Sequence, residues 1–309
     1  MGRVEHRRYV PAKGQRSFLQ AVQQATGLSL AECELIIEMG GAYRGKRRFK
    51  NKSQLLKAGE LIQVFYRLPI QKEEVAFQDD WIVCKEPLFL VARKPAGLPT
   101  QGKRECDTSA FYELLKKRVP GYLGLHHRLD QGTSGLMVFS RSRKSNPAFH
   151  ELFTKRLISK QYLALCTGTW PDSRGERTRV DQPLARVQNR GKHGLYQVDP
   201  GGKPAQTELE LIGQSGGLVL MGAKPLTGRT HQIRVHAAHL GLPLLGDTLY
   251  GGADHGGGFY LHACQLSWPS CQNLNAGSFY APIPKNWYSQ FTDELLHAYK
   301  RWEERCLVD

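Results

Sequence analysis

Seven short runs rich in valine, leucine, phenylalanine and tyrosine recur between residues 81 and 268. Runs of this kind, bounded by glycine, proline and polar residues, predict β-strands. They read WIVC, FLVARKP, GLMVFS, QYLALCTG, AQTELELI, GLVLMGA and FYLHACQLSW. The few helical segments between them do not alternate regularly with the strands, as they would in a doubly wound fold. The pattern therefore predicts an α+β fold whose mixed, mainly antiparallel sheet is flanked by helices.

Four helices are expected among these strands. Asn146 before Pro147 is typical of a helix start, because proline is favoured at the first helical position. Apolar residues at helical spacing indicate the others, which are expected near 108–119, over about 230–240 and near 289–305.

The first 70 residues form a smaller unit. Two short helical patterns are expected there, and Ser29 with Glu32 predicts a capping box at the start of the second. The basic stretch YRGKRRFKNK then leads into the β-rich run AGELIQVFY. Pro69 and the charged sequence QKEE are typical of a linker. We therefore expect two domains, at residues 1–70 and 71–309.

Charge and cysteine usage narrow the function. Lysine and arginine number 43 against 28 acidic residues, a net charge of +15, which favours a polyanionic partner such as nucleic acid. Seven cysteines without a CxxC pair argue against a disulfide scaffold or zinc ribbon and predict a cytoplasmic protein. No apolar run approaches the roughly 18 residues that span a bilayer, so no membrane association is expected. The absence of Walker and GxGxxG motifs predicts no nucleotide cofactor.

Three polar stretches stand out in the second domain, and HHRLDQGTSG is the first of them. An aspartate in such a turn is most often a cap, but Arg128 is near Asp130, and GRTHQIR adds Arg229 and Arg234. A carboxylate beside a guanidinium stays ionised and suits a nucleophile or an electrostatic stabiliser. Arg128 and Asp130 lie two residues apart, so in an extended segment they serve one face without pairing with each other. Tyr162, in KQYLALCTG, is either a core tyrosine or part of the same site.

At these residues the chain resembles the RluA-type pseudouridine synthases. The resemblance covers about residues 80–300, and its motifs appear in the family's order: RKPAGLPTQG, HRLDQGTSG, SKQYLALCTG, GGKPAQTELELI, TGRTHQIRVHAAHLGLPLLGDTLYG and LHACQLSWP. It implies the pseudouridine synthase fold and an RNA-uridine isomerase that needs neither cofactor nor metal. By position, Asp130 is the catalytic carboxylate and Arg234 its partner. Tyr162 stacks on the uracil or acts as base, and Arg128 replaces the flipped base. Attack on the ring, attack on the sugar and stabilisation of an eliminated intermediate all remain open for Asp130.

Further RNA contacts are expected from basic and polar residues in both domains. The N-terminal unit resembles the small αL-type RNA-binding domain shared with a ribosomal protein of the small subunit. Aromatic residues interleaved with its basic stretch suit RNA, because aromatic rings stack on bases. The expected RNA-binding or base-flipping residues, besides Arg128, are His127, Arg229, Lys46, Arg47 and Arg48. The partner is then ribosomal or transfer RNA, with ribosomal RNA favoured, and the protein is expected to be a monomer.

Two other function classes fit parts of the sequence. A non-catalytic RNA-binding or ribosome-assembly protein would keep the fold but has no chemical need for Asp130, Tyr162 and Arg234 together. A metal-dependent hydrolase or deaminase could use His236 and His239, which are three residues apart. No HExxH motif accompanies this pair, so no metal site is expected.

Overall fold

The chain forms two compact units, one ending at Ala76 and the other beginning at Phe77. The computed structural model describes residues 5–11, 16–66, 75–102, 110–188, 194–256 and 258–308. The expected domain boundary at residue 70 lies outside these described ranges. The two units are described separately.

The N-terminal unit packs two helices against a small antiparallel sheet. The sheet has the order β1-β6-β3-β4. The strands and helices of the unit are β1 (Glu5–Tyr9), β2 (Arg16–Ser17), α1 (Phe18–Thr26), α2 (Leu30–Glu38), β3 (Ala42–Arg44), β4 (Arg47–Arg48), β5 (Leu55–Leu56) and β6 (Ile62–Tyr66). One core cluster, which includes Phe18, Val22, Ile36, Ile37 and Ile62, joins helices to strands.

Local capping explains where these two helices begin. The Ser29 side chain accepts the Glu32 N–H, and Glu32 accepts the Ser29 N–H in return. This reciprocal arrangement is the predicted capping box. Gly27 ends α1 with φ of +73°, a conformation that glycine adopts at little cost.

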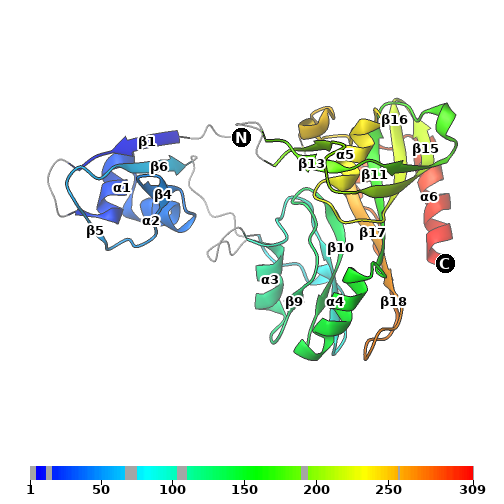
Figure 1. Cartoon of the computed structure of the whole chain (residues 1–309), viewed down its shortest axis with the longest axis horizontal. Coiled ribbons are helices and arrows are strands. Elements are labelled where there is room, and N and C mark those ends of the chain that lie inside the picture. Colours follow the sequence, from blue (N-terminus) through cyan, green and yellow to red (C-terminus); the bar gives the residue numbers. More distant parts are fainter. Residues whose placement is uncertain are drawn as a thin grey trace. The chain divides into compact units, whose positions relative to one another are not determined.

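A ten-stranded mixed sheet forms the C-terminal unit (Figure 1). Its main path is β12-β15-β16-β11-β17-β10-β8-β7, while β18 pairs with β17 and β9 with β10. The strands are β7 (Ile82–Lys85), β8 (Phe89–Lys94), β9 (Gly124–Leu125), β10 (Ser134–Ser140), β11 (Ser159–Thr167), β12 (Arg177–Asp181), β15 (Gln206–Ser215), β16 (Leu218–Pro225), β17 (Leu261–Trp268) and β18 (Gly277–Tyr280). A separate hairpin contains β13 (Leu184–Arg186) and β14 (Tyr196–Val198). Among the described strands of this sheet, only β10 and β17 pair in parallel, so the predicted mixed, mainly antiparallel α+β fold is confirmed.

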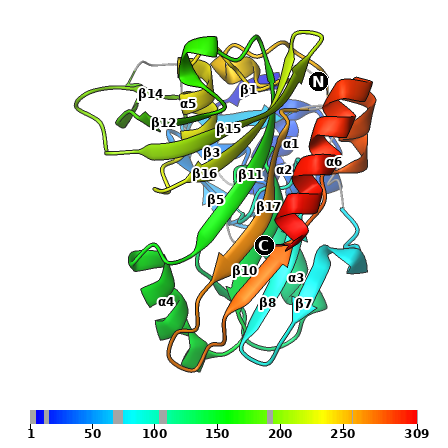
Figure 2. The same ribbon diagram turned by 90° about the vertical axis from the view of Figure 1, so that its right-hand side faces the viewer.

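Helices cover the sheet of this unit. They are α3 (Phe111–Arg118), α4 (Asn146–Thr154), α5 (Gln232–His239) and α6 (Asp293–Val308), with 3-10 turns η1 (Asp79–Trp81), η2 (Arg143–Ser145), η3 (Asp172–Arg174), η4 (Thr248–Tyr250) and η5 (Lys285–Gln290). Figure 1 shows the β11, β15 and β16 region between α5 and α6, and Figure 2 shows α6 running across the front of the sheet. The last helix begins later than expected, because Ser289 and Gln290 belong to η5 and the Thr292 hydroxyl accepts the Leu295 N–H.

The side of the sheet opposite α6 contains the polar site. Leu163 and Leu165 of β11 share a core cluster with Leu295 and Tyr299 of α6. Alternate residues of a strand point to opposite faces, so Tyr162 points away from α6. In the described ranges, no helix is both long and apolar enough to cross a membrane.

Candidate active site

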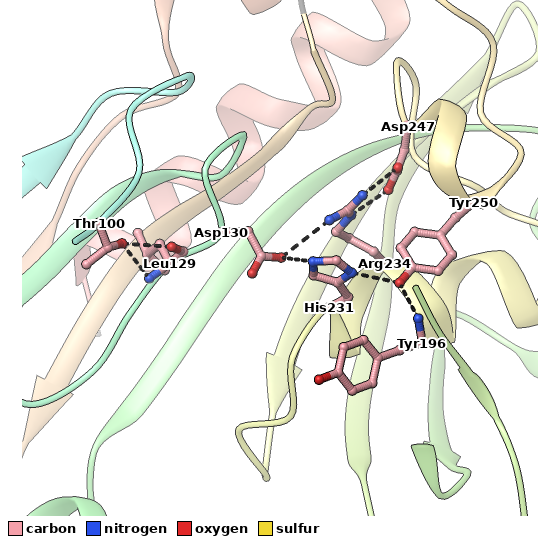
Figure 3. A network of polar contacts seen from close by, with 8 residues as sticks. All are labelled: Thr100, Leu129, Asp130, Tyr196, His231, Arg234, Asp247 and Tyr250. Carbon is pink, nitrogen blue, oxygen red and sulfur yellow. Dashed lines mark hydrogen bonds and ion pairs between the residues drawn. The ribbon is translucent and has the colours of Figure 1, made fainter. Parts of the chain in front are cut away.

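Thr100 fixes the backbone on which Asp130 lies. Its hydroxyl donates to the Leu129 carbonyl at 2.7 Å and accepts the Leu129 N–H at 3.1 Å (Figure 3). Leu129 is buried between the exposed Arg128 and the half-buried Asp130. Because Thr100 binds both the N–H and the carbonyl of Leu129, it also orients the neighbouring side chains of Arg128 and Asp130.

Buried Lys94 also binds the backbone of this loop. Its ammonium group donates to the carbonyls of Pro95, Leu98 and Gln131 at 2.8, 2.7 and 3.1 Å. Burial lowers the pKa of Lys94 to about 7, and the charge of Asp130 partly opposes that shift. Three carbonyl acceptors match the three N–H donors of an ammonium. Lys94 thus ties the turn after β8 to the Asp130 loop.

Glycine is required where this loop enters β10. Gly135 has φ of +116°, and a Cβ there would lie 2.2 Å from the carbonyl oxygen of Ala263. Gly132 lies against the ring of Phe259, which a Cβ would approach to 2.6 Å. The small residues of HHRLDQGTSG therefore allow the loop to pack closely on β17 and the segment before it.

Asp130 is a partly exposed carboxylate between two nitrogen donors. Its Oδ2 lies 3.6 Å from Nη1 of Arg234 and 3.9 Å from Nε2 of His231, with the side chain 28% exposed. Both distances are longer than a direct hydrogen bond. Within the described part of the chain no donor hydrogen-bonds this carboxylate, and no ion pair joins it to Arg128. Asp130 is therefore oriented by charge and remains open to a ligand.

Arg234 has a stronger partner than the predicted one. Its Nε and Nη2 donate to the two carboxylate oxygens of Asp247, both at 2.7 Å, and the Arg234 and Asp247 side chains are only 6% and 1% exposed. The guanidinium also lies between the rings of Tyr250 and Phe259, at 4.8 and 4.2 Å. Burial opposes its charge, but the bonds and charge of Asp247, with that of Asp130, raise the pKa of Arg234 overall. Asp130 therefore receives the remaining nitrogen, Nη1, of an arginine that Asp247 already fixes.

Tyr162 lies on β11, next to an irregularity in its pairing with β17. The residue is 8% exposed, and none of the described residues hydrogen-bonds its hydroxyl. Burial, followed by the negative charge of Asp130, raises the pKa of Tyr162. The side chain is therefore a neutral phenol, which favours stacking on a base over removing a proton from it.

The other predicted RNA contacts in this unit differ in accessibility. Arg128 is exposed and forms no ion pair or hydrogen bond with the described residues. Arg229 is half-buried, and its Nε donates to the Pro204 carbonyl at 3.0 Å. His127 instead has an internal role, because its Nε2 accepts the Val138 N–H at 3.0 Å. Burial lowers the pKa of His127 to about 3, so this side chain is neutral, and its RNA contact stays a prediction.

Lys46, Arg47 and Arg48 lie in the N-terminal unit. All three are exposed, around the turn that joins β3 to β4. The guanidinium of Arg48 lies 5.2 Å from the Tyr43 ring centre and hydrogen-bonds its hydroxyl. The structure therefore groups the predicted residues into two sets. Lys46, Arg47 and Arg48 lie together in the N-terminal unit, and Asp130, Tyr162 and Arg234 lie together in the C-terminal unit.

Sequence reasoning missed several residues of the site. The sequence indicated no role for Asp247, Tyr250 or Phe259. Asp247 and Tyr250 are part of the motif that contains Arg234, so closeness within one motif was the available signal. Thr100 and Lys94 likewise belong to RKPAGLPTQG.

One of the two histidines considered as metal ligands has other partners. His236 is buried, with Nδ1 at 2.8 Å from the Thr207 hydroxyl and Nε2 at 3.0 Å from the Gln182 carbonyl. Among the residues that the structure describes, no three His, Cys, Asp or Glu side chains form a group that could hold a metal ion. Both nitrogens of His236 are therefore engaged within the fold.

A pocket of about 460 Å³ lies beside this site. Its walls include Trp81, Arg93, Phe259 and Trp287, but neither Asp130 nor Tyr162 lines it. The reactive groups are therefore presented outside this pocket.

Comparison with known proteins agrees with this geometry. The family model described as RNA pseudouridylate synthase matches residues 88–239. Ribosomal large subunit pseudouridine synthase C of Vibrio parahaemolyticus is 30% identical over 227 residues, which cover 70% of each chain. The synthase of the same name from Buchnera aphidicola subsp. Acyrthosiphon pisum is 33% identical over 174 residues, covering 56% of this chain and 54% of the relative. This chain therefore spans about half the length of some of the curated relatives that it matches.

Solved structures show the same fold. The structure titled Human RNA Pseudouridylate Synthase Domain Containing 4 has a TM-score of 0.55 and 25% identity, covering 71% of this chain and 92% of that one. Human RNA Pseudouridylate Synthase Domain Containing 1 gives a TM-score of 0.53 and 26% identity, with coverage of 68% and 92%. As its ordered motifs predict, the chain belongs to the RNA pseudouridylate synthase family.

Proposed function

We propose that the C-terminal unit isomerises uridine to pseudouridine within RNA, with Asp130 as the catalytic carboxylate. One observation carries the proposal: Asp130 is 28% exposed and has no direct hydrogen bond among the described residues, yet its Oδ2 lies beside buried Arg234. A partly exposed carboxylate without a hydrogen bond to the described residues, placed beside a buried guanidinium, is free to meet a ligand. The ring of Tyr162, whose hydroxyl is neutral and has no hydrogen-bond partner among the described residues, adds a surface on which a base can stack.

The proposed chemistry needs no external reactant. The bond between N1 of uracil and C1′ of ribose breaks, and a bond between C5 and C1′ forms. The proton on C5 leaves and N1 gains one, so atoms and electrons balance without oxidation or hydrolysis. Asp130 either attacks a carbon or stabilises the positive charge that develops when the first bond breaks. Nη1 of Arg234, 3.6 Å from Oδ2, places a positive charge beside the carboxylate for either role.

Arg128 is the proposed base-flipping residue. A uridine in folded RNA must leave its stack before Asp130 can reach it, at a cost of a few kcal/mol. Arg128 is exposed and unpartnered within the described chain, and its planar guanidinium can fill the space that the base leaves. Changing Arg128 to alanine should slow product formation more than it weakens RNA binding, measured by single-turnover kinetics and filter binding. Equal losses would assign Arg128 to binding alone.

Ribosomal RNA is the proposed substrate, with transfer RNA as the alternative. Relatives named ribosomal large subunit pseudouridine synthase C support this choice. The exposed basic group of Lys46, Arg47 and Arg48 supports a second RNA contact through the N-terminal unit. We further propose that the protein acts as a monomer in the cytoplasm. Light scattering with and without RNA, and cell fractionation, test these two points.

The experiment is a comparison of RNA from cells with and without this protein. Pseudouridines are mapped in ribosomal and transfer RNA by carbodiimide-blocked primer extension. We expect one or more ribosomal sites to disappear, and to return with the wild-type gene or an Asp172→Asn control but not with Asp130→Asn. Asp172 is an exposed aspartate of η3, outside the polar contacts of the site. If every site persists, the isomerase proposal fails and a non-catalytic RNA-binding role replaces it.

A further inference from the structure

We propose that His231 is a positioning residue for Asp130, and that His231 and Arg234 hold Oδ2 so that Oδ1 faces the reacting nucleotide. This inference rests on the proposed function, because it assigns the two oxygens of the proposed catalytic carboxylate. Both contacts to the described residues involve the same oxygen: Nε2 of His231 lies 3.9 Å from Oδ2, and Nη1 of Arg234 lies 3.6 Å from it. No hydrogen bond or ion pair within the described chain occupies Oδ1.

The far side of the His231 ring is fixed by a chain of hydrogen bonds (Figure 3). Nδ1 of His231 lies 2.7 Å from the Tyr250 hydroxyl, and that hydroxyl accepts the backbone N–H of Tyr196 at 3.1 Å. Tyr250 comes from η4 and Tyr196 from β14. Two elements distant in sequence from the Asp130 loop therefore set the orientation of the imidazole.

This chain of bonds also selects the tautomer of His231. The Tyr250 oxygen already accepts the Tyr196 N–H, so its own proton is available to donate to Nδ1. The imidazole then carries its proton on Nε2, the nitrogen that faces Asp130. The opposite tautomer would place the lone pair of Nε2 against a carboxylate, which is electrostatically unfavourable.

Both side chains remain in the forms that this assignment needs. Burial raises the pKa of Tyr250 to about 12, so its hydroxyl keeps its proton. Burial lowers the pKa of His231, while the negative charges of Asp130 and Asp247 oppose that shift and the positive charge of Arg234 adds to it. His231 is therefore a neutral donor. It orients the carboxylate without adding a second cation that would weaken its reactivity.

The backbone of His231 is consistent with a functional constraint. The residue precedes α5 with φ of +57° and ψ of +17°, a left-handed conformation that is uncommon for a residue with a side chain. Such conformations are strained and persist where surrounding contacts fix them. Here the fixed element is the imidazole between Asp130 and Tyr250.

Three variants test the inference in the full-length protein. His231→Leu removes both nitrogens, His231→Gln keeps an N–H near the position of Nε2, and Tyr250→Phe removes the hydroxyl but keeps the ring on Arg234. Single-turnover product formation on a substrate RNA should fall about 100-fold in His231→Leu, the loss typical of a misplaced reacting group, and about 10-fold in Tyr250→Phe. His231→Gln should recover at least 10-fold over His231→Leu. RNA dissociation constants should stay within about threefold of wild type, because the expected loss is in the chemical step.

Matched controls and a structural readout separate positioning from folding. His239→Leu, at the exposed end of the same helix, and Tyr288→Phe, an exposed tyrosine of η5, should react like wild type. Nitrogen NMR of labelled protein should show the proton of His231 on Nε2 in wild type and a mixture of tautomers in Tyr250→Phe.

The results distinguish the inference from the proposed function. If wild-type protein forms no pseudouridine on any RNA tested, the proposed function fails, while the NMR tautomer still tests the placement of His231. If wild type is active and His231→Leu reacts within twofold of it, the positioning role is refuted. Failure of His231→Gln to exceed His231→Leu, or a proton found on Nδ1, also overturns it.

Discussion

Removing Asp247 should destabilise the C-terminal unit by about 3 kcal/mol or more. In wild type, two charge-assisted hydrogen bonds of 2.7 Å join Asp247 to Arg234. Each such bond contributes roughly 1.5–3 kcal/mol, and breaking a buried ion pair costs about 3–5 kcal/mol. In Asp247→Ala the buried guanidinium keeps only the rings of Tyr250 and Phe259 and the longer contact to Asp130. These partial compensations place the expected cost at the lower end of that range.

Urea denaturation followed by tryptophan fluorescence measures this cost. All five tryptophans lie at residue 81 or later, so the signal reports the C-terminal unit alone. The matched control is Arg177→Ala, which breaks an ion pair whose arginine is 78% exposed and should cost less than about 1 kcal/mol.

A double-mutant cycle with Arg234→Met isolates the pair itself. Each single change leaves one buried charge unpaired, whereas the double variant leaves none. We therefore expect the double variant to be at least about 2 kcal/mol more stable than the sum of the single effects predicts. Additive costs, or a loss below 1 kcal/mol in Asp247→Ala, would refute the assignment of Asp247 as the partner that fixes Arg234.

Two further predictions concern stability. His262 is fully buried, its Nδ1 lies 2.8 Å from the Ser134 hydroxyl, and burial lowers its pKa from 6.5 to about 4. The contribution of neutral His262 to the free energy of unfolding is therefore complete above pH 6.5 and is lost as pH falls toward 4, by about 3 kcal/mol in total. In urea titrations His262→Asn should flatten this acid dependence. The exposed control His150→Asn should not flatten it. Gly135→Ala should cost more than about 2 kcal/mol because its Cβ would meet the Ala263 backbone, whereas Gly241→Ala, with φ of +77° and open space, should cost about 1 kcal/mol. Equal effects in either comparison would contradict the reasoning.

Local signals in the sequence predicted the parts of the fold that depend on neighbouring residues. Ser29 and Glu32 form the expected capping box because both partners lie within one helical turn. Runs rich in valine, leucine, phenylalanine and tyrosine likewise predicted the strands, including the one that carries Tyr162. Family motifs, read in order, predicted membership of the RNA pseudouridylate synthases.

Contacts made across the fold could not be predicted in the same way. Arg234 lies 3.6 Å from Asp130, as the expected pairing requires, but its shorter contacts are to Asp247. The loop after α5 returns Asp247 to the helix, and no spacing rule encodes that path. His127 was expected to contact RNA beside Arg128, and nothing in the sequence indicates that its Nε2 accepts the Val138 N–H. The fixed tautomer of His231 depends on Tyr250 and Tyr196 together, which only the folded chain brings into contact.

The most direct test of the central claim compares Asp130→Asn with wild type on one RNA. Pseudouridine formation under single-turnover conditions and RNA binding are measured on the same preparations. We expect product formation to be abolished and the dissociation constant to stay within about tenfold, because this change removes the charge but keeps the shape of the side chain. Product formation by Asp130→Asn would contradict the catalytic assignment, and a loss of binding as large as the loss of turnover would make Asp130 a structural residue.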